Sequence, residues 1–182
     1  VGLGESFSLS DIRIPGVLQR IALVYLSCAI LYNHSSWFQQ LVVMLFLLVG
    51  YYVVMVFVPV PGIGPGVLEP GKNLAAYIDS ILIPGAMWQG TWDPEGILST
   101  FPAIATGISG MMAGHLIISK LKAEKIVIWM FVIGVFCLLD SFVWEWLFPI
   151  NKNLWTSTYV MYTSGWAFLI LATSIWICDV MK

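Results

Sequence analysis

A short polar run near the start of the chain, Arg13-Ile-Pro-Gly-Val-Leu-Gln-Arg20, leads directly into an apolar segment. Pro15 has no N–H to satisfy and suits the first turn of a helix, which predicts that a helix begins there. At about 1.5 Å per residue, Arg20 lies roughly 8 Å beyond that start. Its guanidinium either snorkels to the lipid headgroups or, with Gln19, faces a polar site between helices. In such a site it would hold a carboxylate or carbonyl through its planar fork, and Asp93 and Glu95 are the expected partners.

The composition is that of an integral membrane protein. The 182 residues are 59% hydrophobic and only 10% charged, the mean hydropathy is +0.90, and soluble domains carry about 25% charged residues. The net charge of −2 gives no reason to expect a nucleic-acid partner. The three cysteines have neither metal-ligand spacing nor a disulfide framework, so we expect no metal. Their absence from the long loop favours a bacterial plasma membrane.

Apolar runs predict an all-α, polytopic transmembrane helix bundle with about five spans. These predicted spans cover residues 15–32, 38–60, 97–118, 126–147 and 154–178. We expect the chain, 1–182, to form a single membrane domain and to be a fragment of a larger polytopic protein, because it opens on Val1 and closes directly behind an apolar run.

One long loop, residues 61–96, separates the second span from the third. Its first part is too rich in Pro and Gly for a helix or a central strand, whereas residues 73–82 have the pattern of a short amphipathic helix. A loop of this length is usually functional, although a lid that merely covers the end of the bundle is the alternative.

Two features of the third span predict packing rather than chemistry. Gly110 and Gly114 form a GxxxG pair, which is typical of closely approaching helices. His115 near the far end is expected to be a satisfied packing or interfacial histidine.

The distribution of lysines predicts the orientation. Lys120, Lys122 and Lys125 crowd one short loop, which places that loop in the cytoplasm. Alternation of the spans then puts the long loop, the start of the chain and the 151–153 turn together on the outer face. We therefore expect an outward-facing polar site of mixed charge. Its candidate residues are Arg13, Gln19, Arg20, Asp79, Asp93, Glu95, Asn151, Lys152 and Asn153.

Five motifs, in order and at similar spacing, resemble those of the heparan-alpha-glucosaminide N-acetyltransferase family and its bacterial relatives. They are Arg13-Ile-Pro-Gly-Val-Leu-Gln-Arg20, Pro61-Gly62…Gly66…Leu68…Pro70, Tyr77-Ile78-Asp79, Asp93-Pro94-Glu95-Gly96-Ile97-Leu98 and Asn151-Lys152-Asn153-Leu154-Trp155. The resemblance covers nearly the whole chain, and it is the joint occurrence of the motifs that makes it specific.

This resemblance implies an enzyme that takes an acetyl group from cytosolic acetyl-CoA and delivers it to a glucosamine-type amino sugar of a glycan across the membrane. In such a reaction the sugar nitrogen must lose a proton, and the developing oxyanion needs hydrogen-bond donors. The family's catalytic histidine lies upstream of the Arg-Ile-Pro-Gly motif, in a region this sequence does not contain. The resemblance therefore assigns no catalytic residue here, and whether the chain is itself an enzyme stays open.

Two other classes of protein compete with this interpretation. A transporter or channel subunit for a small polar solute would place a site at the membrane midplane on broken helices, whereas here the polar motifs gather at one face. A non-catalytic scaffold fits poorly with Arg20 and the long loop. Membrane lipid is an expected partner in every case, and a homo-oligomer is compatible with each of them.

Overall fold

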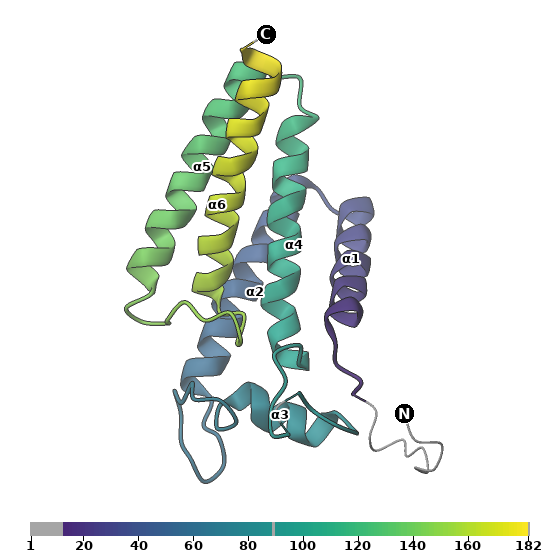
Figure 1. Cartoon of the computed structure of the whole chain (residues 1–182), viewed down its shortest axis with the longest axis vertical. Helices are drawn as coiled ribbons and strands as arrows, with labels where there is room; N and C mark the ends of the chain where they lie inside the picture. The colour runs from purple at the N-terminus through teal and green to yellow at the C-terminus, as the bar shows by residue number, and fades with distance from the viewer. Residues whose placement is uncertain (1–12, 89, 182) are drawn as a thin grey trace, which may run out of the picture.

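A computed structural model describes residues 13–88 and 90–181, and over these residues the chain is an all-helical bundle (Figure 1). The helices are α1 (Val17–His34), α2 (Trp37–Phe57), α3 (Leu74–Leu82), α4 (Ile97–Ile117), α5 (Ala123–Trp144) and α6 (Ser157–Ile175), the last continued by a π-helical turn over Trp176–Val180. The described residues form no strand beyond an isolated bridge between Val60 and Gly64. The predicted all-α membrane fold is confirmed, including a short helix in the long loop.

Four helical segments within the described residues are long and apolar enough to cross a membrane: α2, α4, α5 and Ser157–Val180. α1 is an 18-residue helix of the same bundle but does not reach their apolarity, because Gln19 and Arg20 near its start and Asn33 and His34 at its end lower the mean. The expected count of about five spans thus becomes four clear spans, with α1 as a fifth long helix.

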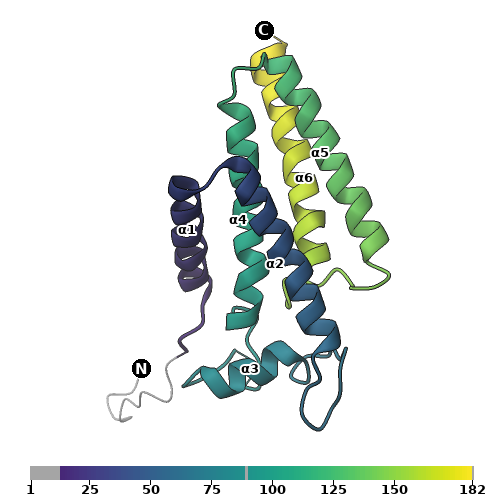
Figure 2. The same cartoon turned by 180° about the vertical axis from the view of Figure 1, so that it is seen from behind.

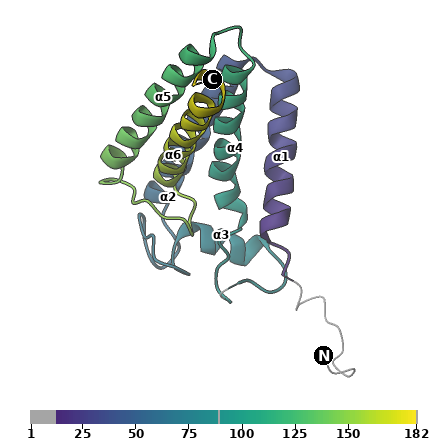
Figure 3. The ribbon, with the colours of Figure 1, turned by 45° about the horizontal axis from the view of Figure 1, so that its top comes forward.

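Helix α4 is the centre of the bundle. It contacts α1, α2, α3 and α6, whereas α5 packs mainly against α6 as its antiparallel partner (Figure 2). α1 stands on the flank and packs chiefly against α4. The short helix α3 lies across one end of the bundle, where the segments before and after it also gather (Figure 3). The segments that carry the candidate polar residues therefore meet at the α3 end, and the lysine loop lies at the opposite end.

The packing of α5 against α6 depends on two glycines that face each other. A Cβ on Gly165 would lie 2.9 Å from the carbonyl oxygen of Gly134, and a Cβ on Gly134 would lie 3.0 Å from that of Gly165. By contrast, a Cβ on Gly110 or Gly114 would meet no described atom within 4 Å. Among the described residues, the GxxxG pair therefore makes no close helix contact, contrary to the prediction, and its open face leaves room for larger side chains.

A buried amide joins three helices at the end away from α3. The Gln40 side chain is fully buried, and its Nε2 donates to the carbonyl oxygens of Leu31 and Ser35. Its Oε1 lies 2.9 Å from Nε2 of His115, and the His115 ring stacks on Tyr32. His115 is thus a packing residue with a hydrogen-bond partner, as the sequence predicts.

Candidate functional site

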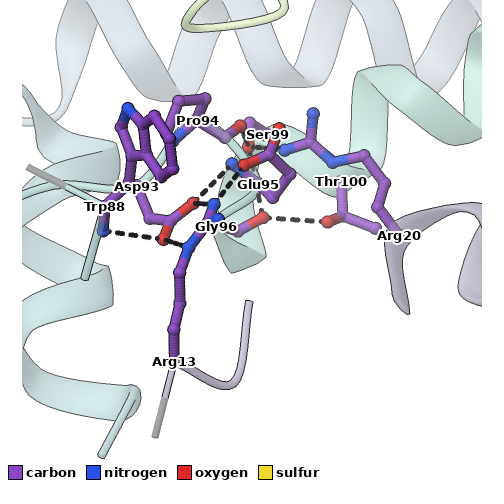
Figure 4. Close-up of polar contacts among 9 residues, drawn as sticks. All are labelled: Arg13, Arg20, Trp88, Asp93, Pro94, Glu95, Gly96, Ser99 and Thr100. Carbon is purple, nitrogen blue, oxygen red and sulfur yellow. Dashed lines mark hydrogen bonds and ion pairs between the residues drawn. The ribbon is translucent and has the colours of Figure 1, made fainter. Parts of the chain in front are cut away.

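Arg13 binds two carboxylates just before α1 begins (Figure 4). Its Nε lies 2.7 Å from Oδ2 of Asp93, and its Nη2 lies 2.8 Å from Oδ1 of the same carboxylate and 2.5 Å from Oε2 of Glu95. The guanidinium also lies 4.9 Å from the ring centroid of Trp88. This planar, bidentate pairing ties the segment just before α1 to the segment before α4.

The Asp93 carboxylate is the centre of this cluster. Only 5% of the residue is exposed, and the carboxylate also accepts the backbone N–H groups of Trp88 and Glu95 at 3.1 and 3.0 Å. Burial on its own raises the pKa of Asp93, but Arg13 and these backbone donors outweigh burial and hold the pKa below its ordinary value. Asp93 is therefore a charged structural anchor at neutral pH.

Arg20 is buried, with 6% of its surface exposed. Its Nη2 donates to the carbonyl oxygen of Pro94 and to Oγ of Ser99 (Figure 4), and its guanidinium lies 5.2 Å from the ring centroid of Trp155. The side chain thus points into the protein rather than extending to the surface. The expected hydrogen bonds to Asp93 or Glu95 are not formed, because the adjacent Arg13 already binds both carboxylates.

Asp79 holds the beginning of α4 from the neighbouring helix α3. The residue is 1% exposed, and its Oδ1 accepts the N–H of Ile97 at 2.9 Å, which is one of the orphan donors at a helix N-terminus. Its Oδ2 has no hydrogen-bond partner among the described residues. Burial raises the pKa of Asp79 to about 6. A Cβ on Gly96 would lie 1.8 Å from Oδ2, so this contact requires glycine there.

The three polar residues of the turn before α6, Asn151, Lys152 and Asn153, have different roles. Oδ1 of Asn151 accepts the N–H groups of Asn153 and Leu154 at 2.9 and 3.3 Å, and the Asn151 N–H donates to Oγ1 of Thr156 at 3.0 Å. Asn151 therefore shapes the turn, and Asn153 follows on its exposed side. Lys152 is the member of this turn that lines a cavity.

That cavity has a volume of about 1050 Å³ and lies between α1 and α4. Arg20, Glu95 and Lys152 form its charged end. Its walls along the two helices are mostly apolar or small, and include Val24, Tyr25, Cys28, Ala103, Gly107, Gly110 and Met111. The cavity therefore combines one polar, mixed-charge end with an apolar body.

The structure divides the nine candidate residues into groups. Arg20, Glu95 and Lys152 line the cavity, and Arg13 and Asp93 lie directly behind Glu95. Asp79, Asn151 and Asn153 belong to the supporting structure, whereas Gln19 is exposed on α1 and does not line the cavity. Among the described residues, no group of three His, Cys, Asp or Glu side chains is placed to hold a metal ion.

Sequence reasoning missed Trp155, which forms part of the cavity wall. Its φ of 50° is the only positive value of a non-glycine residue in the part of the chain that the structure describes, and such strained positions cluster at functional sites. The indole Nε1 donates to Oγ1 of Thr106 at 3.1 Å, and the ring covers the Arg20 guanidinium. Its position just after the Asn151–Asn153 turn was the available signal.

Taken together, the fold and the site define a polytopic helical membrane protein with a cavity between α1 and α4 that has a mixed-charge end. No protein-family model matches the chain. Heparan-alpha-glucosaminide N-acetyltransferase of Homo sapiens is 30% identical to it and that of Mus musculus 28%, each over 95% of this chain and 34% of the relative. Over nearly its whole length the chain is thus similar to part of the heparan-alpha-glucosaminide N-acetyltransferases, the resemblance that its motifs predict. It spans about a third of the length of these curated relatives.

Proposed function

We propose that this chain is part of a transmembrane N-acetyltransferase. In this proposal the complete protein takes an acetyl group from acetyl-CoA in the cytosol and transfers it to a glucosamine-type amino sugar on the outer side of a bacterial plasma membrane. The similarity to two named acetyltransferases supports the class of reaction. The lysine loop between α4 and α5 lies at one end of the bundle, and the segments before α1, α4 and α6 lie toward the other end (Figure 1), which is consistent with a donor and an acceptor on different sides.

The observation that carries the proposal is the meeting of Arg20, Glu95 and Lys152 at one end of a large cavity. Acylation of an amine requires removal of its proton and stabilisation of the oxyanion that develops on the acyl carbonyl. The cavity offers guanidinium and ammonium donors for an oxyanion. Its carboxylate and cations also suit the hydroxyls and the amine of an amino sugar. We assign the base itself to none of these residues.

Acetyl transfer by the complete protein tests this function. The purified protein in detergent or liposomes is given acetyl-CoA with a labelled acetyl group and a glucosamine-terminated disaccharide. We expect label in the N-acetylated sugar above a boiled control. The proposal fails if no labelled sugar forms, and uptake of the unmodified disaccharide into sealed liposomes would instead support a transporter.

A further inference from the structure

Arg20 carries a buried charge that no carboxylate of the described residues neutralises by direct contact. Both of its hydrogen-bond acceptors, the Pro94 carbonyl and the Ser99 hydroxyl, are neutral. Glu95 attracts Arg20 electrostatically, but its hydrogen-bonded ion pair is with Arg13. Burying a charge without a close counter-charge is costly, and proteins retain such an arrangement where it has a function.

Arg20 lines the cavity and has N–H donors that no described residue accepts. Its Nε is buried without a partner among the described residues, and no described residue accepts a hydrogen bond from its Nη1. The indole of Trp155, 5.2 Å away, covers one face of the guanidinium and so limits its movement. Arg20 is thus held in place with donors to spare.

Lys152 supplies a second cation to the same cavity from a different part of the chain. It is exposed and forms no ion pair with any described residue. The cavity end therefore has two cations and one carboxylate, and that carboxylate is already bound to Arg13. The surplus of positive charge faces open space of about 1050 Å³.

We propose that the charged end of the α1–α4 cavity is an anion-binding site, in which Arg20 and Lys152 hold a carboxylate, sulfate or phosphate group of a substrate. The proposal rests on the acetyltransferase function above. A planar guanidinium matches these oxyanions in a bidentate manner, and the ammonium adds a point charge. The anion belongs either to an acidic sugar joined to the amino-sugar acceptor or to the phosphates of the acetyl-CoA donor.

Steady-state kinetics of the complete protein test this site. The two acceptors are a glucosamine disaccharide with a uronic acid as second sugar and the same disaccharide with a neutral hexose in that position. We expect Lys152→Gln to raise KM for the anionic substrate by up to about fivefold, as for an exposed ionic contact. Arg20→Gln should raise it about tenfold or more, as for a charge-assisted hydrogen bond.

The pattern of KM changes identifies the anion. A rise confined to the uronic-acid acceptor places the acceptor's carboxylate in the site, whereas a rise confined to acetyl-CoA places the donor's phosphates there. Lys72→Gln is the matched control, because Lys72 lies at the same end of the molecule and is paired with Glu69 outside the cavity. Unchanged KM values for both substrates in Lys152→Gln would overturn the proposal.

Binding without turnover separates this proposal from the proposed function. The unfolding temperature of the complete protein is measured with the uronic-acid disaccharide, its neutral counterpart and acetyl-CoA as probes. We expect one anionic probe to raise it in the wild type and in Lys72→Gln, and to raise it less in Lys152→Gln. Because Lys152 is exposed, this variant decides the question even if Arg20→Gln does not fold. Equal shifts in wild type and Lys152→Gln would refute the site, whether or not the protein transfers acetyl groups.

Discussion

The two arginines of the opening motif have different environments although they are seven positions apart. Arg13 is neutralised by Asp93 and Glu95 and acts as a tie between segments. Arg20 is buried against neutral acceptors and an indole, beside a cavity. Arg13 thus has a structural role, whereas Arg20 keeps N–H donors that could bind a ligand. The difference arises because Arg13 already binds both carboxylates.

Asp79 should make the stability of the protein depend on pH in a characteristic direction. Its folded-state pKa is raised to about 6 by burial, so the folded state takes up a proton at a higher pH than the unfolded chain does. Contributions from this group therefore increase stability as the pH falls from about 7 towards about 4. Asn cannot titrate but keeps an oxygen for the Ile97 N–H. We therefore expect the unfolding temperature of Asp79→Asn, taken relative to that of wild type, to be higher at pH 7.5 than at pH 5.

Asp93 provides the contrast for this measurement. Its folded-state pKa is lowered, so its contribution is present above the unfolded pKa of about 4 and is lost only as the pH falls through the lower folded value. Asp93→Asn should therefore be destabilised to the same extent at pH 7.5 and at pH 5. A constant difference between Asp79→Asn and wild type over this range would contradict a raised pKa for Asp79.

At the scale of the helix, length and apolarity were enough to predict where the helices lie, because a membrane span and a polar turn differ over many residues. The meeting of the 13–20, 93–98 and 151–155 segments at one end of the bundle also followed from alternation. The hydrogen-bond partners of the arginines could not be predicted in this way, because whether Arg13 or Arg20 binds Asp93 depends on side-chain geometry within a few ångströms. The strained backbone of Trp155 and the open face of Gly110 likewise depend on tertiary packing.

The two kinds of glycine in the bundle give a prediction at the level of helix packing. Gly165→Ala places a methyl group 2.9 Å from a backbone oxygen of α5, which cannot move without separating the helices, so we expect a loss of about 1–3 kcal/mol. Gly114→Ala meets open space and should gain up to about 1 kcal/mol from helix propensity. Denaturation of both variants in detergent measures the difference. Equal stability of the two would show that α5 and α6 are not in close contact.

For the whole molecule, the separation of charges along the bundle predicts its orientation in the membrane. Lys122 belongs to the loop between α4 and α5 at one end of the bundle, whereas Lys72 precedes α3 and Lys152 precedes α6, in segments toward the other end (Figure 1). All three residues are exposed. We expect position 122 in the cytoplasm and positions 72 and 152 outside. Single cysteines at these positions, in a background without the three native cysteines, are treated in intact cells with a membrane-impermeant thiol reagent. Labelling at 72 and 152 but not at 122 is the expected result, and the reverse pattern would invert the topology.

The distance in sequence between the arginines and their partners has a consequence for biosynthesis. Arg13 binds residues 80 and 82 positions later, and Arg20 binds residues 74 and 79 positions later. At about 5–20 residues per second, a ribosome needs roughly 4–16 s to make that intervening chain. During this interval α1 emerges with a cation whose acceptors do not yet exist. Helix α1 can therefore complete its hydrogen bonds only after the start of α4 has been synthesised. We infer that α1 reaches its final position in the bundle after α4, the helix against which it packs.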